Sequence, residues 1–196
     1  MHGNNFVQQD IEVTLRQAVD KGFGELLPDS SLEVRLVPRQ ILSFADELVR
    51  VCLVSIDGPQ HGVLAVVVAD RETDYLCGKI IRAMLGPVEA ADLNADERRS
   101  LIEGSFLELG NRLGAEFSAM LPQGDTFEMS FPIILNGREL RLLSPHEFFA
   151  TLAVTVCNTP LLIYAGLQSV DDPDANAVLP STSIEELRRE ILNAGT

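Results

Sequence analysis

Residues 103–115 read EGSFLELGNRLGA and decide the fold of this chain. Around them the sequence predicts one long helix that begins at Asn94 or Asp96 and ends at about Leu121, where Pro-Gln-Gly follows. At about 100° per residue, the large apolar side chains of this helix gather on one face. They are Ile102, Phe106, Leu109, Leu113, Phe117 and Met120. This face is predicted to be buried.

The other side of the same helix carries small or polar residues, almost opposite the apolar face. They are Gly104, Glu108, Asn111, Ala115 and Ser118. Only Glu108 and Asn111 project far, whereas a solvated helix face is ordinarily filled with Glu, Lys, Arg and Gln. Each glycine inside a helix costs about 1 kcal/mol relative to alanine. The glycines therefore either leave room for another surface or let the helix pack closely in a buried crossing, and the residues alone leave both alternatives open.

Glu108 and Asn111 stand one helical turn apart, and their chemistry favours positioning over covalent catalysis. Neither is a good nucleophile at neutral pH, and the three histidines, His2, His61 and His146, are scattered along the chain. An amide donates and accepts hydrogen bonds at once and can hold a water molecule, whereas a carboxylate can pair with a lysine. Together they suit the orientation of a water against a phosphoryl group that another protein supplies with its metal and lysine.

Hydrophobic periodicity predicts the elements on either side of this helix. A leading amphipathic helix is expected over residues 6–27, and a second helix over 70–85, capped by Asp70, with Leu76, Ile80, Ile81, Met84 and Leu85 facing inward. The Asn136-Gly137 dipeptide favours a type I′ hairpin turn. Strands are expected at 32–36, 48–57, 63–69, 126–135, 138–143, 148–156 and 161–167.

The composition excludes several classes of function. The chain has 196 residues, 46% of them hydrophobic, and a net charge of −14, which argues against nucleic-acid binding. No apolar run approaches the roughly 20 residues of a membrane span, and no signal peptide is recognised, so a cytoplasmic protein without a membrane partner is expected. Cys52, Cys77 and Cys157 lie apart in apolar stretches, which suits reduced thiols rather than a metal site.

The chain is expected to form one folded domain over residues 6–168. A polar segment with Asp and Pro follows at 169–182 and is expected to be flexible. The S-x-x-E capping box from Ser183 to Glu186 then predicts a C-terminal amphipathic helix over 183–194. This helix either packs back on the domain or docks a partner.

The run from Glu103 to Ala115, followed by Ser-Phe-Pro at 130–132 and Asn-Gly at 136–137, resembles the CheX branch of the CheC/CheX/FliY phosphatases of bacterial chemotaxis. That family is marked by E-x-x-N on a long helix with a downstream strand proline. CheC-like relatives usually carry two such helices, and the single one here favours a CheX-like protein. The resemblance implies an α+β, two-layer fold: an antiparallel or mixed sheet packed by a leading helix and two central helices, the second of them long.

The resemblance also implies an activity. The chain would accelerate hydrolysis of the aspartyl phosphate of a CheY-like response regulator, with Asn111 presenting the attacking water and Glu108 pairing with the regulator's lysine. No covalent intermediate would form. Partner contacts are expected at Gly104, Arg112, Ala115 and Ser118, and Pro132 would be structural. Mg²⁺ would be held by the regulator, no cofactor by this chain, and a homodimer is expected because CheX relatives act as two-fold dimers.

Two other functions stay open at this point. One is a non-catalytic module of the CheC/CheX fold that binds a response regulator or a flagellar switch component. The other is a domain in which the glycine-rich helix is simply buried. The sequence departs from the family at Gly104, where Asp or Ser is frequent, and at Glu116, where a neutral polar residue is usual. Both departures bear on whether catalysis is retained, and Glu116 also bears on the choice of partner.

Overall fold

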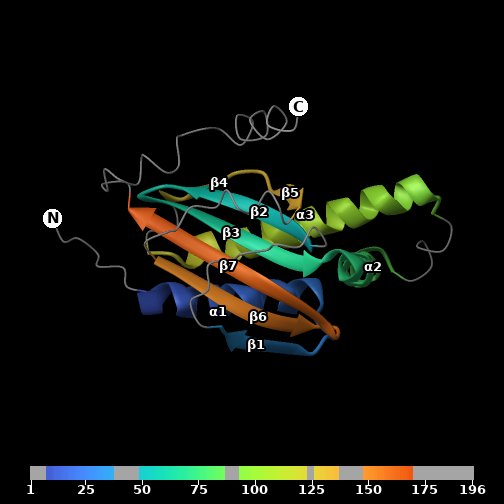
Figure 1. Ribbon diagram of the computed structural model, residues 1–196, viewed down its shortest axis with the longest axis horizontal. Coiled ribbons are helices and arrows are strands. Elements are labelled where there is room, and N and C mark those ends of the chain that lie inside the picture. Colours follow the sequence, from blue (N-terminus) through green and yellow to red (C-terminus); the bar gives the residue numbers. More distant parts are fainter. Residues whose placement is uncertain (1–7, 38–48, 87–92, 123–125, 137–147, 170–196) are drawn as a thin grey trace.

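The computed structural model describes residues 8–37, 49–86, 93–122, 126–136 and 148–169. Within these ranges the chain forms three helices and seven strands (Figure 1). In chain order they are α1 (Gln8–Leu26), β1 (Leu32–Leu36), β2 (Val49–Asp57), β3 (Gln60–Ala69), α2 (Asp70–Leu85), α3 (Ala95–Met120), β4 (Glu128–Met129), β5 (Ile133–Asn136), β6 (Phe148–Val156) and β7 (Thr159–Ser169).

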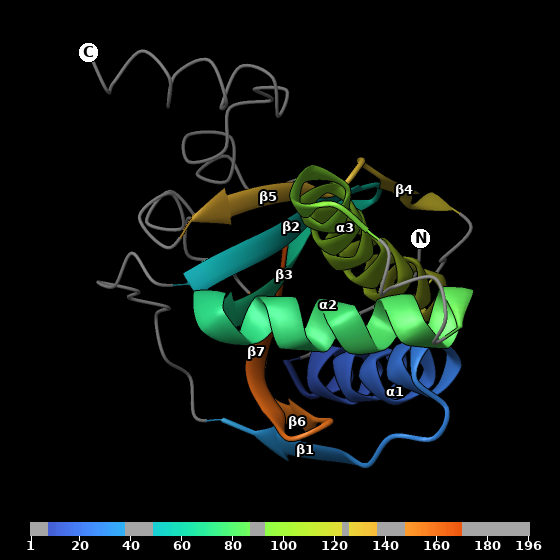
Figure 2. The same cartoon turned by 90° about the vertical axis from the view of Figure 1, so that its right-hand side faces the viewer.

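The strands form a single sheet in the order β1-β6-β7-β3-β2-β4, and β5 also pairs with β2. Every described pairing is antiparallel, so the sheet is not mixed. Figure 2 shows the sheet curving around α1 and α3, with the helices on one side of it. The predicted α+β class, with a leading helix and two later helices, is confirmed.

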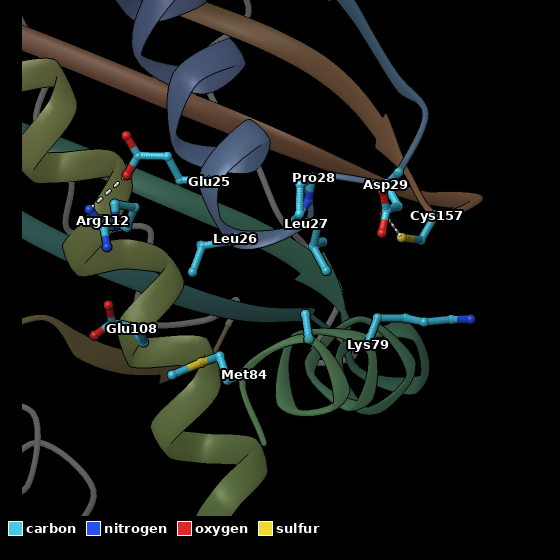
Figure 3. A pocket seen from close by; sticks show the side chains of 12 residues that line it. Glu25, Leu26, Leu27, Pro28, Asp29, Lys79, Met84, Glu108, Arg112 and Cys157 are labelled. Carbon is cyan, nitrogen blue, oxygen red and sulfur yellow. Dashed lines mark hydrogen bonds and ion pairs between the residues drawn. The ribbon is translucent and has the colours of Figure 1, made fainter. Parts of the chain in front are cut away.

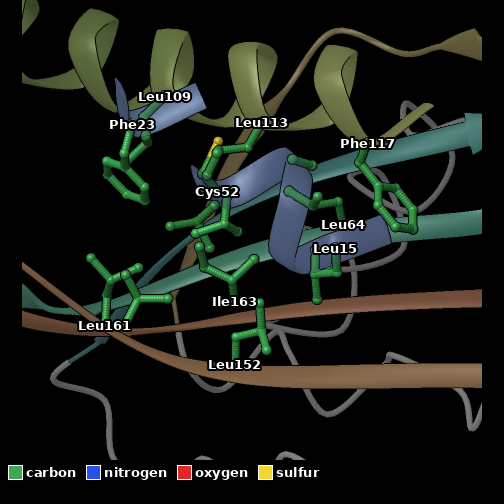
Figure 4. Close-up of a cluster of buried hydrophobic side chains, with 14 of the residues drawn as sticks. Leu15, Phe23, Cys52, Leu64, Leu109, Leu113, Phe117, Leu152, Leu161 and Ile163 are labelled. Atoms are coloured by element: carbon green, nitrogen blue, oxygen red, sulfur yellow. The ribbon is translucent and has the colours of Figure 1, made fainter. Parts of the chain in front are cut away.

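Alternating residues of the central strands are buried on both faces of the sheet. In β2, Cys52 and Ile56 belong to the main core beneath the helices, whereas Val51 and Leu53 belong to a smaller cluster on the opposite face. The main core also takes in side chains from all three helices. Figure 4 shows those from α1 and α3 together with side chains of the strands. A fully buried Leu or Phe stabilises the fold by about 1.5–3 kcal/mol. Burial on both faces explains why these strands are nearly continuous apolar runs.

The predicted strand at 126–135 is interrupted, which corrects the sequence expectation. Between β4 and β5 the backbone leaves regular pairing, and the N–H of Ser130 donates to the carbonyl of Ser55 at 3.0 Å. The hydroxyl of Ser130 accepts a hydrogen bond from the N–H of Ser55, also at 3.0 Å. Pro132 lies in this break at the edge of the sheet, where its missing N–H is tolerated.

The start and end of α2 differ in part from the prediction. Asp70 is the first helical residue and not the cap, since the N-cap position is Ala69 and no side chain caps it. Gly86 ends the helix as predicted, at φ +85°, and its N–H donates to the carbonyl of Arg82. Met84 and Leu85 were predicted to face inward, but they are 57% and 49% exposed. The apolar stripe continues past the point at which neighbouring elements cover the helix.

Turns are only partly captured by the sequence signals. The hairpin between β6 and β7 turns at Cys157 and Asn158, both at positive φ, although the sequence suggested a longer connection there. Asn136 ends β5, whereas the rest of the predicted Asn136-Gly137 turn and the strand at 138–143 lie outside the described residues. Of the predicted segment 169–182, only residue 169 is described, and the predicted helix at 183–194 also lies outside the described residues.

Candidate functional site

The long helix α3 begins at a capping box. The side chain of Asn94 accepts from the N–H groups of Asp96 and Glu97, and the Glu97 carboxylate accepts from the N–H of Asn94, each at 3.0 Å. The helix therefore begins where the sequence predicted, and of the two candidate residues, Asn94 and Asp96, it is Asn94 that forms the N-cap. The helix ends at Met120, before Leu121, as predicted. Its predicted apolar face is buried, with Met120 partly exposed.

Two of the three glycines in α3 serve the packing of the helix on the sheet. A Cβ atom at Gly110 would collide with the Sγ atom of Cys52 on β2. A Cβ atom at Gly114 would lie 3.1 Å from both the Sδ atom of Met129 and a methyl group of Val54. The close-packing explanation therefore holds for these two positions: at Gly110 only hydrogen fits between helix and sheet, and at Gly114 the fit is tight.

Gly104 differs from the other two glycines. It is exposed, and a Cβ atom there would meet nothing within 4 Å. No packing within the described part of the chain accounts for a residue that costs about 1 kcal/mol relative to alanine in a helix. Close packing therefore does not explain Gly104 among the described residues, and Gly24 of α1 and Gly78 of α2 are open in the same way.

Glu108 and Asn111 lie on the solvent side of α3, Glu108 partly exposed and Asn111 exposed. Among the described residues, neither side chain has a hydrogen-bond or ion-pair partner within the protein. The alternative that a helix crossing buries Glu108 and Asn111 is therefore wrong. We call Gly104, Glu108, Asn111 and Ala115 the ridge.

Ser118 does not belong to the ridge, although the helical wheel placed it there. It is only 8% exposed, and its hydroxyl donates to the carbonyl of Ala115 at 3.1 Å. The edge strand β4 packs along this end of α3, with Met129 against Gly114, one turn before Ser118. The expected partner contact at Ser118 is therefore replaced by a local hydrogen bond, and the exposed line ends at the partly exposed Ala115.

Charged residues beside the ridge are paired with α1. The guanidinium of Arg112, expected to contact a partner, forms an ion pair with Glu25 at 2.8 Å. Glu116, expected to influence partner choice, is 8% exposed and pairs with Lys21 at 2.6 Å between Nζ and Oε2. The Glu116 carboxylate raises the pKa of Lys21, by accepting its hydrogen bond and by charge attraction. Sequence reasoning missed both pairs because the partners lie about 90 residues apart.

A hollow of about 510 Å³ opens beside Glu108, between the C-terminal end of α1, the last turns of α2 and the middle of α3 (Figure 3). Leu26 at the end of α1 and Leu27 just after it contribute apolar surface, and Met84 contributes it from α2. Glu108 and Arg112 line the α3 side, and the rest of the wall comes from residues 28–30 and from Cys157 in the β6–β7 turn. No pattern in the sequence indicated this hollow, because its walls come from segments far apart in the chain.

Within the described residues, no group of three His, Cys, Asp or Glu side chains is placed to hold a metal ion. Burial raises the pKa of the Cys52 and Cys77 thiols to about 12. None of the described helices combines the length and apolar character that a membrane crossing requires.

The arrangement therefore suits action on a second molecule. A carboxylate and an amide stand one turn apart on a rigid helix, with an open Gly104 next to them, and no nucleophile or metal ligand lies alongside in the described part of the chain. Such a pair can bind and orient a water molecule and a cation, but it cannot activate a phosphoryl group by itself.

Comparisons with known proteins agree with this fold. No protein-family model and no curated protein sequence matches the chain. Among solved structures, a chain in the CheX–CheY–BeF₃–Mg²⁺ complex from Borrelia burgdorferi is similar at a TM-score of 0.61 and 11% identity, over 80% of this chain and 97% of that one. The chemotaxis protein CheX from Desulfovibrio desulfuricans gives 0.55 and 12%, over 81% and 99%.

A third similar structure is a CheC-like superfamily protein from a Shewanella species, with a TM-score of 0.55 and 13% identity, over 82% of this chain and 98% of that one. At these low identities, the TM-scores show a shared fold and do not show a shared activity. The resemblance that the sequence suggested is confirmed at the level of the fold: the chain has the α+β fold of the CheX and CheC-like chemotaxis proteins.

Proposed function

We propose that this chain is a phosphatase that accelerates hydrolysis of the aspartyl phosphate of a CheY-like response regulator. The observation that carries the proposal is the ridge: Glu108 and Asn111 face outward together, without partners among the described residues, beside a glycine with nothing above it. The similar Borrelia structure, which is a complex of CheX with CheY, BeF₃ and Mg²⁺, supports the choice of partner.

Glu108 and Asn111 have different roles in the proposed reaction. The Asn111 amide binds the attacking water through its donor and acceptor groups and places it in line with the phosphoryl group. Glu108 pairs with a lysine of the regulator and so fixes the orientation of the helix in the partner's site. The regulator holds Mg²⁺, and water attacks phosphorus directly, so that aspartate leaves as a carboxylate and no phosphoryl group is transferred to this chain.

The decisive test measures the lifetime of the phosphoryl group on candidate CheY-like receivers, with Mg²⁺, in the presence of variants of this chain. Asn111→Ala is expected to slow the catalysed release of phosphate by about 100-fold or more, the scale of losing one well-placed polar group. Because Asn111 is exposed, the fold should be unchanged, as circular dichroism and the unfolding midpoint would show. Full activity of Asn111→Ala toward the cognate receiver would refute the mechanism.

Two acids of α3 provide a matched control. Glu108→Gln removes the charge on the ridge, whereas Glu103→Gln removes the charge of another acid on the same helix, about 140° away around the axis. We expect a strong loss of activity only for Glu108→Gln. Wild-type protein that binds a phosphorylated receiver without shortening its lifetime would instead indicate a non-catalytic binding module.

Gly104 allows an independent test of partner approach. Gly104→Gln should raise the helix stability, since nothing lies within 4 Å of the added Cβ atom, and at the same time reduce phosphatase activity because the long side chain stands on the ridge. A gain in both stability and activity would argue against close approach of a partner at this position. The homodimer implied by the resemblance stays a prediction, which sedimentation velocity can measure.

A further inference from the structure

The hollow and the ridge share a residue. Glu108 belongs to the ridge and also forms part of the wall of the hollow. Figure 3 shows its side chain on α3, near Met84, which comes from the end of α2. A protein surface that contacts Glu108 therefore lies next to the hollow.

At the α2 edge of the hollow, such a partner would meet two exposed apolar side chains. Met84 is 57% exposed and Leu85, next to it, is 49% exposed, although both are large hydrophobic residues. Of the two, Met84 lines the hollow, together with the nearly buried Leu26 and Leu27. Methionine is flexible and polarizable, and it adapts well to the shape of a docked side chain. An exposed apolar side chain at a concave site next to a polar ridge suits an anchor point of a protein interface.

The charge of α2 near the hollow fits an acidic partner. The chain carries a net charge of −14, which on its own would repel the carboxylates that surround Mg²⁺ in a receiver. Residues 75–85 of α2 contain Lys79 and Arg82 and no acid. The α2 edge of the hollow, where Met84 lies, is therefore basic, whereas Glu25, Asp29 and Glu108 line its other sides. The basic edge reduces the repulsion on the side of α2.

We propose that the hollow beside Glu108 takes up an apolar side chain from the receiver surface that borders the phosphorylated aspartate, with Met84 as its main contact. This inference rests on the proposed function and adds an anchor that supplies affinity, separate from the two residues that act on the phosphoryl group. Docking of the anchor and insertion of the ridge occur together because both include Glu108.

The test uses binding, so that it does not depend on catalysis. Full-length wild-type protein is titrated against CheY-like receiver domains loaded with Mg²⁺ and BeF₃⁻, a stable mimic of the phosphoryl group. Met84→Gln keeps the length and helix preference of the side chain but makes it polar. It is expected to weaken binding by about 5- to 10-fold, as follows from losing part of one buried apolar side chain.

Matched variants separate docking from other effects. Val13→Thr makes a similar change at a 50% exposed position on α1 away from the hollow, and its Kd should stay within about twofold of wild type. In turnover assays, Met84→Gln should raise KM and leave kcat unchanged, whereas Asn111→Ala should lower kcat and leave the Kd for the loaded receiver unchanged.

The outcomes distinguish this inference from the proposed function. If Met84→Gln binds the loaded receiver as tightly as wild type, the anchor is wrong and the phosphatase proposal stands. If wild type binds and Met84→Gln does not, yet wild type never shortens the phosphoryl lifetime, the anchor is right and the catalytic proposal is wrong. If wild type binds none of the loaded receivers, both are overturned.

Discussion

Lys21 of α1 and Glu116 of α3 form an ion pair in which Nζ lies 2.6 Å from Oε2. The two side chains are in different surroundings, since 53% of the lysine side chain is exposed but only 10% of that of the glutamate. The pair joins α1 to the helix that carries Glu108 and Asn111, on the side of α3 away from β4. It is therefore a structural contact of the fold.

The unequal exposure predicts an unequal response to mutation. Lys21→Gln leaves the Glu116 carboxylate poorly solvated and without its cation, whereas Glu116→Gln leaves a lysine that water can solvate. We expect Lys21→Gln to lower the free energy of unfolding more than Glu116→Gln does, in urea titrations at pH 7. The exposed pair Glu25–Arg112 is the control, because neutralising either partner there should cost about 0.5 kcal/mol or less. The reverse order for Lys21 and Glu116 would contradict the structural assignment.

The glycines of α3 predict opposite effects of the same substitution. Gly104→Ala should stabilise the protein by about 1 kcal/mol, since its Cβ atom meets nothing. Gly110→Ala should destabilise it by about 1–3 kcal/mol, because the new methyl group collides with Cys52. Thermal or urea unfolding of the two variants measures both values. Equal effects at the two positions would mean that α3 does not pack on β2 as described.

The three cysteines are expected to differ in reactivity. Cys52 and Cys77 are buried, with thiol pKa values of about 12, whereas Cys157 is partly exposed in the turn between β6 and β7. Because the thiolate is the reactive form, a thiol reagent at pH 8 should modify Cys157 rapidly and the other two only after unfolding. Mass spectrometry of native and urea-treated protein identifies the modified sites. Rapid native labelling of Cys52 would show that the core opens beneath α3.

The same two thiols predict a loss of stability in alkaline solution. Their pKa rises from 9.0 to about 12 on folding, so the native state retains protons that the unfolded state releases. Their contribution to stability is complete below pH 9 and decreases as the pH rises from 9 toward 12. The raised pKa of Lys21 acts in the same direction above its ordinary value of 10.5. Urea midpoints should therefore fall above pH 9, under reducing conditions.

A variant without the two buried thiols tests the origin of this effect. Cys52→Ala combined with Cys77→Ala should flatten the decrease between pH 9 and 10, even though its stability at pH 7 is lower because two buried side chains are truncated. An equally steep decrease in that variant would assign the alkaline loss to other groups.

The sequence anticipated α3 well because its signals are local. Capping by Asn94 depends on residues within one turn, and the burial of Phe106 and Leu113 follows from a regular spacing around the helix axis. The exposure of Asn111 follows from the same geometry. Local periodicity also sufficed for α1 and for the strands around the β2–β3 hairpin.

Periodicity was misleading where it depends on the extent of a neighbouring element. Met84 continues the apolar stripe of α2, but the covering layer ends before it, so the side chain lines the hollow in place of filling the core. Ser118 continues the polar stripe of α3, but β4 reaches far enough to cover it. A helical wheel gives the direction of a side chain and carries no information about how far the next element extends.

The sequence by itself determined that an acid and an amide stand one turn apart on a long amphipathic helix, because the backbone geometry of a helix fixes the relative directions of residues three apart. Only the tertiary structure decided which glycines are needed for packing, that Arg112 and Glu116 are held by α1, and that a hollow lies beside Glu108. These features depend on contacts between segments far apart in the chain, whose positions are set by the packing of three helices against one sheet.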